Sequence, residues 1–163
     1  MFVSVRRKVR RGDKRWLEYI KAVDRPHLDE VRTMDWYMNP YPPHAGDVNC
    51  TVETLDQALD KLPIPDMNNE YYLLVIDVLN DSVARIPDGW KLLGYDLSDE
   101  TRTSSLHNCG PWEGHLEPLV RRLNGLGLLS LADAELARKL LPMEWGENMD
   151  HTNVTIWALY ERA

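Results

Sequence analysis

The residues best suited to chemistry lie close together in one short stretch, SSLHNCGPWEGH (104–115). It holds two histidines, His107 and His115, and one of the chain's two cysteines, Cys109. A thiol just before a helix is acidified by the free backbone N–H groups and the helix dipole, and a nearby histidine can accept its proton. One interpretation is therefore a small hydrolase or transferase, with Cys109 as nucleophile and His107 or His115 as base.

The same stretch allows two other interpretations. Its two histidines and Cys109 are possible zinc ligands, but structural zinc sites usually contain paired C-x2-C or H-x3-H elements, and this spacing has neither. Asn108 and Gly110 are typical turn residues, and a free cysteine is commonly a small buried apolar residue. We therefore favour a turn that introduces a helix, with no metal, no cofactor and no catalytic residue.

Four segments have the alternating or continuous apolar pattern of β-strands, namely 2–10, 71–79, 90–97 and 152–161. The second of these is apolar almost throughout, which predicts a central strand covered on both faces. It contains Asp77, and a buried carboxylate needs a partner. Asp77 therefore either belongs to a site or lies at the strand end, and we favour the strand end.

Three segments have the spacing of amphipathic helices, namely 51–62, 114–124 and 131–141. Thr51 is a suitable N-cap for the first of them. Ser130 with Asp133 resembles a capping pair for the third, and Pro142 is expected to end it.

The order of these elements lacks a regular alternation of strand and helix, which favours the α+β class. We predict a single α+β domain over residues 1–163, with a mainly antiparallel sheet of about 4–5 strands and helices packed on one face. The first and last strands are expected to pair.

Charge is unevenly distributed along the 163 residues, whose net charge is −7. Residues 1–15 hold seven basic side chains and one acidic side chain, whereas residues 16–163 form an acidic body. Arginines and lysines on an exposed edge strand block aggregation, which is the interpretation we favour for the basic segment. Nucleic-acid binding through this segment is the alternative.

Aromatic and acidic residues suggest where a partner protein would bind. Six tryptophans and seven tyrosines stand against one phenylalanine, and both abundant types are favoured at interfaces. Trp36, Tyr37 and Tyr41 gather beside a proline-rich loop. Carboxylates that could form an acidic binding surface are Asp47, Glu53, Asp56, Asp60, Asp96, Asp99 and Glu100.

Composition points to a cytoplasmic protein. No apolar run approaches the ~20 residues that cross a bilayer, and the N-terminus carries charges where a signal peptide needs its apolar stretch. Two cysteines do not make a disulfide framework, so we expect Cys50 and Cys109 to be reduced thiols.

Residues 89–160 resemble a group of small bacterial proteins. The resemblance rests on GWKLLGYDLSD, TSSLHNCG, LVRRLNGLGLL and the terminal VTIWALYE. Such proteins are similar in size, charge and layout to immunity proteins of polymorphic or contact-dependent toxin systems. The shared positions are glycines, turns and apolar residues, so the resemblance implies binding to another protein and carries over no catalytic residue.

Together these observations predict a non-catalytic protein-binding module, either an immunity-type inhibitor of a toxin or a regulatory interaction protein. The partner is another protein, with no role for a membrane. The Cys109 enzyme and nucleic-acid binding through residues 1–15 are the alternatives.

Overall fold

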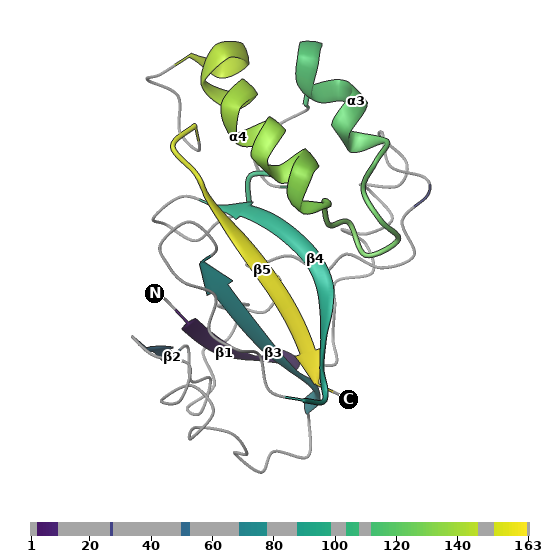
Figure 1. The fold of residues 1–163 in the computed structure, drawn as a ribbon, viewed down its shortest axis with the longest axis vertical. Coiled ribbons are helices and arrows are strands. Elements are labelled where there is room, and N and C mark those ends of the chain that lie inside the picture. The colour runs from purple at the N-terminus through teal and green to yellow at the C-terminus, as the bar shows by residue number, and fades with distance from the viewer. Residues whose placement is uncertain are drawn as a thin grey trace.

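The computed structural model describes the backbone of residues 3–9, 27, 50–52, 69–77, 88–98, 104–107, 112–146 and 152–162. Side chains are described for residues 27, 88–98, 104–107, 112–146 and 152–161. Figure 1 shows a twisted sheet with the helices gathered over one end of it.

The strands β4 (Trp90–Ser98) and β5 (Thr155–Arg162) form an antiparallel pair. The pairing shifts between Leu92 and Gly94, which places one extra residue in β4 as a β-bulge. Beyond the bulge β4 alternates: Leu97 belongs to the core that packs under the helices, whereas its neighbours face the opposite side. Both strands lie where the apolar pattern predicts them.

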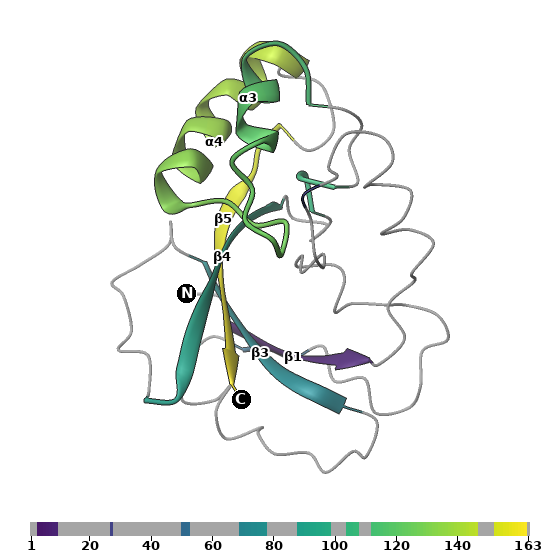
Figure 2. The ribbon, with the colours of Figure 1, turned by 90° about the vertical axis from the view of Figure 1, so that its right-hand side faces the viewer.

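Within the described residues the helical segments are η2 (Gly114–Leu116), α3 (Glu117–Val120) and α4 (Leu131–Trp145). Figures 1 and 2 show α3 and α4 near the end of the sheet where β4 ends and β5 begins. The three share one core with β4 and β5, and that core includes Trp112, Leu116, Leu119, Ala134, Ala137, Leu141, Leu97 and Ile156. Among the described residues no helix is long and apolar enough to span a bilayer.

The expected helix over 114–124 is wrong in length, because helical structure ends at Val120. Asn124 explains the early end. Its side-chain oxygen accepts hydrogen bonds from the N–H groups of Leu126 and Leu128, both at 3.0 Å, and its amide donates to the carbonyl of Leu93 at 2.8 Å. The side chain thus folds residues 124–128 into a turn that replaces another helical turn.

The helix α4 begins as predicted and ends later than predicted. The Ser130 hydroxyl accepts a hydrogen bond from the N–H of Asp133 at 3.2 Å, which confirms the capping pair. Pro142 does not end the helix but lies inside it, three residues before its end. A proline in the last turn removes only one backbone donor, and the N–H of Gly146 closes the helix by donating to the carbonyl of Pro142 at 3.0 Å.

A second, smaller apolar cluster comprises Leu128, Trp157 and Leu159, with Leu93 and Leu126 packed against it. The segment before α4 joins it to the sheet, because Leu129 and Tyr95 exchange two backbone hydrogen bonds of 2.9 and 3.0 Å. Residues Ile156 to Leu159 are therefore buried in succession.

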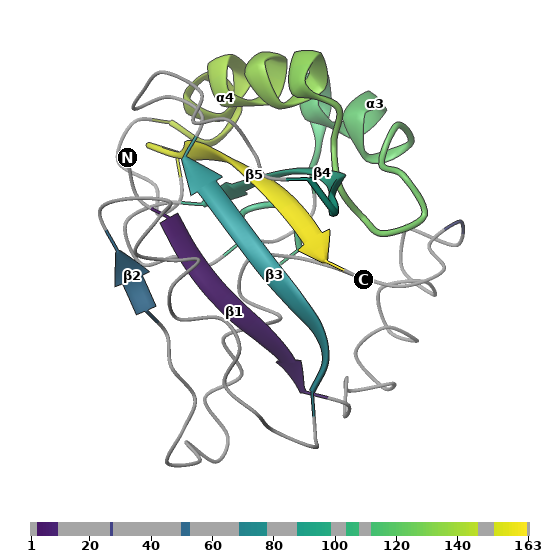
Figure 3. The same cartoon turned by 60° about the horizontal axis from the view of Figure 1, so that its bottom comes forward.

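The backbone of three further strands extends the sheet, namely β1 (Val3–Val9), β2 (Cys50–Val52) and β3 (Asn69–Asp77). The strand order is β2-β1-β3-β5-β4, with antiparallel pairing throughout, and Figure 3 shows β1, β3 and β5 side by side.

Two expectations about these strands are corrected by the register. The first and last strands do not pair, because β3 lies between β1 and β5. Thr51 and Val52 lie in β2 and pair with Ser4 and Val3, so a helix does not begin at Thr51. Both residues are β-branched, a type that favours strands. The same pairing makes β2 the edge strand of the sheet beside Val3–Val5. Along these residues β1 is therefore not the edge strand that the sequence predicts.

Antiparallel strands with helices packed against them make this an α+β fold, as the element pattern predicts. The packing that supports this fold class is the shared core of β4, β5 and the helices.

Candidate functional site

A buried polar cluster lies at the end of β4. Asp96 is fully buried, and its Oδ1 accepts hydrogen bonds from the Ser104 hydroxyl at 2.7 Å and from the N–H of Leu97 at 2.8 Å. The Ser104 oxygen in turn accepts the N–H of Leu106 at 3.3 Å. A carboxylate removed from water needs such partners, so this cluster fixes residues 104–107 against β4.

The burial of Asp96 corrects one prediction about the acidic binding surface. The prediction places Asp96 on an exposed acidic surface, but Asp96 lies within β4 and is 0% exposed. Asp96 points to the side of β4 opposite Leu97 and is enclosed there. It cannot contact a partner protein from that position.

Hydrogen bonds hold the described residues of the 104–115 stretch in place at several points. The N–H of Ser105 donates to the carbonyl of Leu97 at 2.7 Å, and the indole N–H of Trp112 donates to the carbonyl of Ser105 at 2.9 Å. His107 uses Nε2 to donate to the carbonyl of Gly127 at 2.8 Å, since a carbonyl can only accept. These contacts are those of a structural connection.

His115 belongs to η2 and lies apart from His107, beside the C-terminal end of α4. Its Nδ1 is hydrogen bonded to the Glu144 carboxylate, and the same carboxylate accepts the backbone N–H of His115 at 3.0 Å. The backbone hydrogen bond and then the imidazole hold the pKa of Glu144 below its ordinary value of 4.5. The His115 side chain is 78% exposed, so this dyad joins η2 to α4 at the surface.

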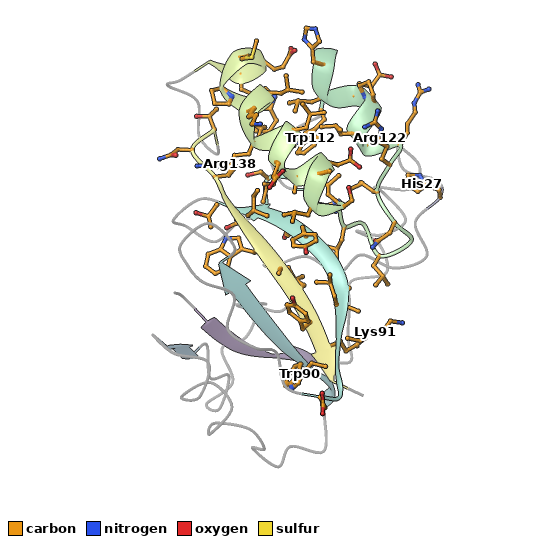
Figure 4. All side chains as sticks on the ribbon, in the orientation of Figure 1. His27, Trp90, Lys91, Trp112, Arg122 and Arg138 are labelled. Atoms are coloured by element: carbon orange, nitrogen blue, oxygen red, sulfur yellow. The ribbon has the colours of Figure 1, made fainter. Side chains whose placement is uncertain are left out.

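One further ion pair and one further hydrogen bond hold the helices in place. Arg122 of the α3–α4 connection contacts Asp133 in the first turn of α4 at 2.8 Å, and Arg138 donates to the carbonyl of Val154 at 3.0 Å. Figure 4 shows both arginines with Trp112 at the helical end of the molecule. The α4 helix is thus tied to α3 and to the chain that enters β5.

Trp157 is the centre of a row that crosses three strands. It is the register partner of Asp96 on β4 and of Asp77 on β3. Its indole is 7% exposed, and Nε1 has no hydrogen-bond partner within the described part of the chain. β3 ends at Asp77, as predicted for that residue.

The remaining predicted site residues lie outside the residues whose side chains are described. They include Cys50 and Cys109, the basic side chains of residues 1–15, the aromatic residues Trp36, Tyr37 and Tyr41, and the carboxylates Asp47, Glu53, Asp56, Asp60, Asp99 and Glu100. Within the described ranges no group of three or more His, Cys, Asp or Glu side chains is placed to hold a metal ion.

One surface feature was missed in the sequence, namely the outer side of α4. Leu136 is 42% exposed and Met143 is 74% exposed, although both lie in a helix whose opposite side is in the core. The signal is present in the sequence as apolar residues at 132, 136 and 143, which fall on one side of a helix. It was hidden because the apolar residues of the core-facing side are interleaved with them.

Comparison with known proteins gives no further assignment: no family model, no curated protein and no solved structure matches this chain.

Proposed function

We propose that the chain is a non-catalytic protein-binding module, acting as an immunity-type inhibitor of a toxin or as a regulatory interaction protein in the cytoplasm. One observation carries the proposal: the described polar groups of the candidate sites hold the fold together. Asp96 binds Ser104, and His107 binds the carbonyl of Gly127. Such groups stabilise the scaffold on which a binding surface is presented.

The net negative charge of the chain also supports the binding of a partner protein. The net charge of −7 gives the molecule an attractive field for a cationic partner, such as the active-site cleft of a nuclease. The carboxylates proposed for contact are Asp47, Glu53, Asp56, Asp60, Asp99 and Glu100, with Trp36, Tyr37 and Tyr41 as aromatic anchors. Electrostatic complementarity of this kind raises the association rate more than it raises affinity.

The test begins with recovery of a stoichiometric complex from the native cell and continues with kinetics on the purified pair. We expect Asp56→Lys with Asp60→Lys to lower the association rate about tenfold or more, and the effect to shrink at high salt. Asp88→Lys, at an exposed position of the turn before β4, is the matched control and should change the rate little. Recovery of the bare chain alone, at near-native concentration, contradicts the proposal.

The Glu144–His115 dyad favours one second candidate function, a hydrolase or transferase that uses Cys109. A carboxylate bonded to Nδ1 orients an imidazole and leaves Nε2 to act as a base, which is the arrangement used to activate a thiol. Cys109 precedes His115 by six residues. This candidate predicts rapid alkylation of Cys109 well below pH 8.5, slowed about tenfold by Glu144→Gln. Slow alkylation that is insensitive to Glu144 removes it.

We further propose that residues 1–163 fold as a single domain, with one sheet of five strands that carries its helices on one face. The strand order and the shared core of β4, β5 and the helices support this arrangement. A single cooperative unfolding transition, seen alike by tryptophan fluorescence and by circular dichroism, is expected. Two separate transitions contradict it.

A further inference from the structure

The connection between α3 and α4 contains the only Asn-Gly pair of the sequence, Asn124–Gly125. An asparagine before glycine is prone to lose its side-chain amide, because glycine has no Cβ to keep its backbone nitrogen away from the asparagine side chain. Asn124 is exposed, so water and base can reach it. Figures 1 and 2 show this connection running close to β4, and its chemistry therefore bears on how the helices are joined to the sheet.

Deamidation at this pair needs no reactant other than a base and water. The base removes the proton of the Gly125 N–H, and the nitrogen attacks Cγ of Asn124 to close a cyclic imide. The bond from Cγ to Nδ2 breaks, and Nδ2 leaves as ammonia with the proton that the base returns. Water then opens the imide at one of its two carbonyl carbons, which leaves aspartate or isoaspartate at this position.

The folded chain holds the Asn124 side chain at both ends of its amide. Oδ1 accepts hydrogen bonds from the N–H groups of Leu126 and Leu128, both at 3.0 Å. Nδ2 donates to the carbonyl of Leu93 at 2.8 Å. Hydrogen bonds of an amide lie near its plane, so these three bonds fix that plane. Attack on Cγ comes from outside the plane, and the amide cannot turn its face toward Gly125 while the bonds are intact.

Backbone hydrogen bonds hold the attacking group as well. The Gly127 N–H donates to the carbonyl of Asn124, and the Asn124 N–H donates to the carbonyl of Leu128, both at 2.9 Å. These bonds fix the peptide units on either side of Asn124, including the one whose nitrogen must attack. Closing the imide therefore requires residues 124–128 to open locally, and the rate is limited by the population of the open state.

The product of the reaction does not fit the site that the amide occupies. A Cβ placed on Gly94 would lie 3.2 Å from Nδ2, so the amide lies against the bulge of β4. Aspartate has a carboxylate oxygen in place of Nδ2, and this oxygen cannot donate to the Leu93 carbonyl. Isoaspartate inserts a methylene group into the backbone of the turn. Either product loses the hydrogen bond that ties the turn to β4.

We propose that Asn124–Gly125 is a deamidation site that the folded protein keeps closed and that reacts when residues 124–128 open. Because the product lacks the hydrogen bond to Leu93, a chain that reacts while open refolds to a less stable structure. The modification therefore turns a reversible opening into a permanent loss of stability. It is independent of the binding function proposed above, since the pair belongs to none of the proposed contact residues.

Incubation of the full chain at mildly alkaline pH, either folded or unfolded in guanidinium chloride, tests the closure. Mass spectrometry of peptides follows conversion of Asn124, and a peptide of residues 121–130 gives the intrinsic rate in each solvent. We expect conversion to be about tenfold or more slower in the folded chain. Gly125→Ala, whose added Cβ hinders the attack, should slow conversion in the unfolded chain. Equal conversion of folded and unfolded wild type, after correction by the peptide, overturns the proposal.

Asn124→Asp tests the effect of the product on stability. We expect it to lower the midpoint of guanidinium unfolding, because a carboxylate oxygen then faces the Leu93 carbonyl. Asn153→Asp adds the same charge at an exposed position before β5 and is the matched control, which should leave the midpoint nearly unchanged. Circular dichroism monitors the fold of both variants. A midpoint of Asn124→Asp equal to that of Asn153→Asp also overturns the proposal.

Discussion

Gly94 lies where β4 bulges against the segment that leads into α4. Its φ is 149°, a backbone conformation that side chains other than glycine rarely adopt, and a Cβ placed there would lie 2.6 Å from the Cβ of Leu128. Gly94→Ala therefore combines backbone strain with a clash against a fully buried side chain. We expect it to lower the free energy of unfolding by about 3 kcal/mol, measured by urea denaturation.

Gly89 provides the control for that prediction. Its φ is 89°, but a Cβ at this position meets no atom within 4 Å. Gly89→Ala therefore isolates the conformational cost, and we expect a loss of about 1 kcal/mol. Equal losses for the two variants would show that Leu128 yields and that the close contact is not a constraint.

Glu144 makes the free energy of unfolding depend on pH in the acid range. Because its pKa is lowered in the folded state by His115, its contribution to stability is complete above the ordinary value of 4.5 and is lost as the pH falls through the lowered value. Glu144→Gln should therefore flatten the dependence of the midpoint of urea unfolding on pH below about 4.5. Glu113→Gln, at an exposed position beside η2, is the control. An unchanged acid limb in Glu144→Gln contradicts the prediction.

Ser130 and Asp96 show which properties of a single residue can be predicted from the sequence and which cannot. The capping role of Ser130 follows from local chemistry, and the structure confirms it. The environment of Asp96 depends on Ser104, which reaches it only because residues 104–107 fold back on β4. Its sequence neighbours, such as Asp99 and Glu100, suggest an exposed acidic cluster, so its complete burial was not predictable.

At the scale of elements, the N-terminus of α4 offers a direct measurement of capping. The Ser130 hydroxyl accepts from the N–H of Asp133 and donates to its carboxylate at 2.9 Å. Ser130→Ala removes both bonds, and we expect the free energy of unfolding to fall by about 1 kcal/mol in thermal or urea denaturation. Ser130→Asp retains a cap and should lose less. Equal losses in the two variants would show that capping is not what Ser130 contributes.

The observed ends of helices and strands show which features a local sequence pattern can predict. Apolar spacing continues through Leu123, which is buried, yet the helix stops at Val120. The same side chain can be buried from a turn, and the Asn124 hydrogen bonds select that turn. Periodicity therefore identifies which residues enter the core more reliably than it identifies the element that carries them there. The same holds for Val52, whose apolar character suits a helix stripe or a strand equally well.

At the scale of the whole molecule, the described core divides between two faces of β5. Ile156, with Val154 just before the strand, belongs to the cluster under the helices, and Trp157 and Leu159 belong to the cluster with Leu128. The alternation along β5 predicts this division from the sequence. The strand order could not be predicted, because the order in which antiparallel strands pair depends on contacts between distant segments. The two-sided burial of β5 makes it the strand on which the two parts of the core meet.

This position leads to a prediction for native-state hydrogen exchange. β5 is paired on both sides, by β3 and β4, and its residues from Ile156 to Leu159 are at most 7% exposed. The hydrogen bonds of their amides break only when the sheet itself opens. Lys91 and Leu92, near the start of β4, are exposed, and Figure 4 shows Lys91 at the end of the sheet away from the helices. We therefore expect Ile156–Leu159 to exchange about tenfold or more slowly than Lys91 and Leu92, as measured by mass spectrometry of peptides. Similar rates in the two segments would show that the sheet opens as one unit and that β5 is not the centre of the fold's stability.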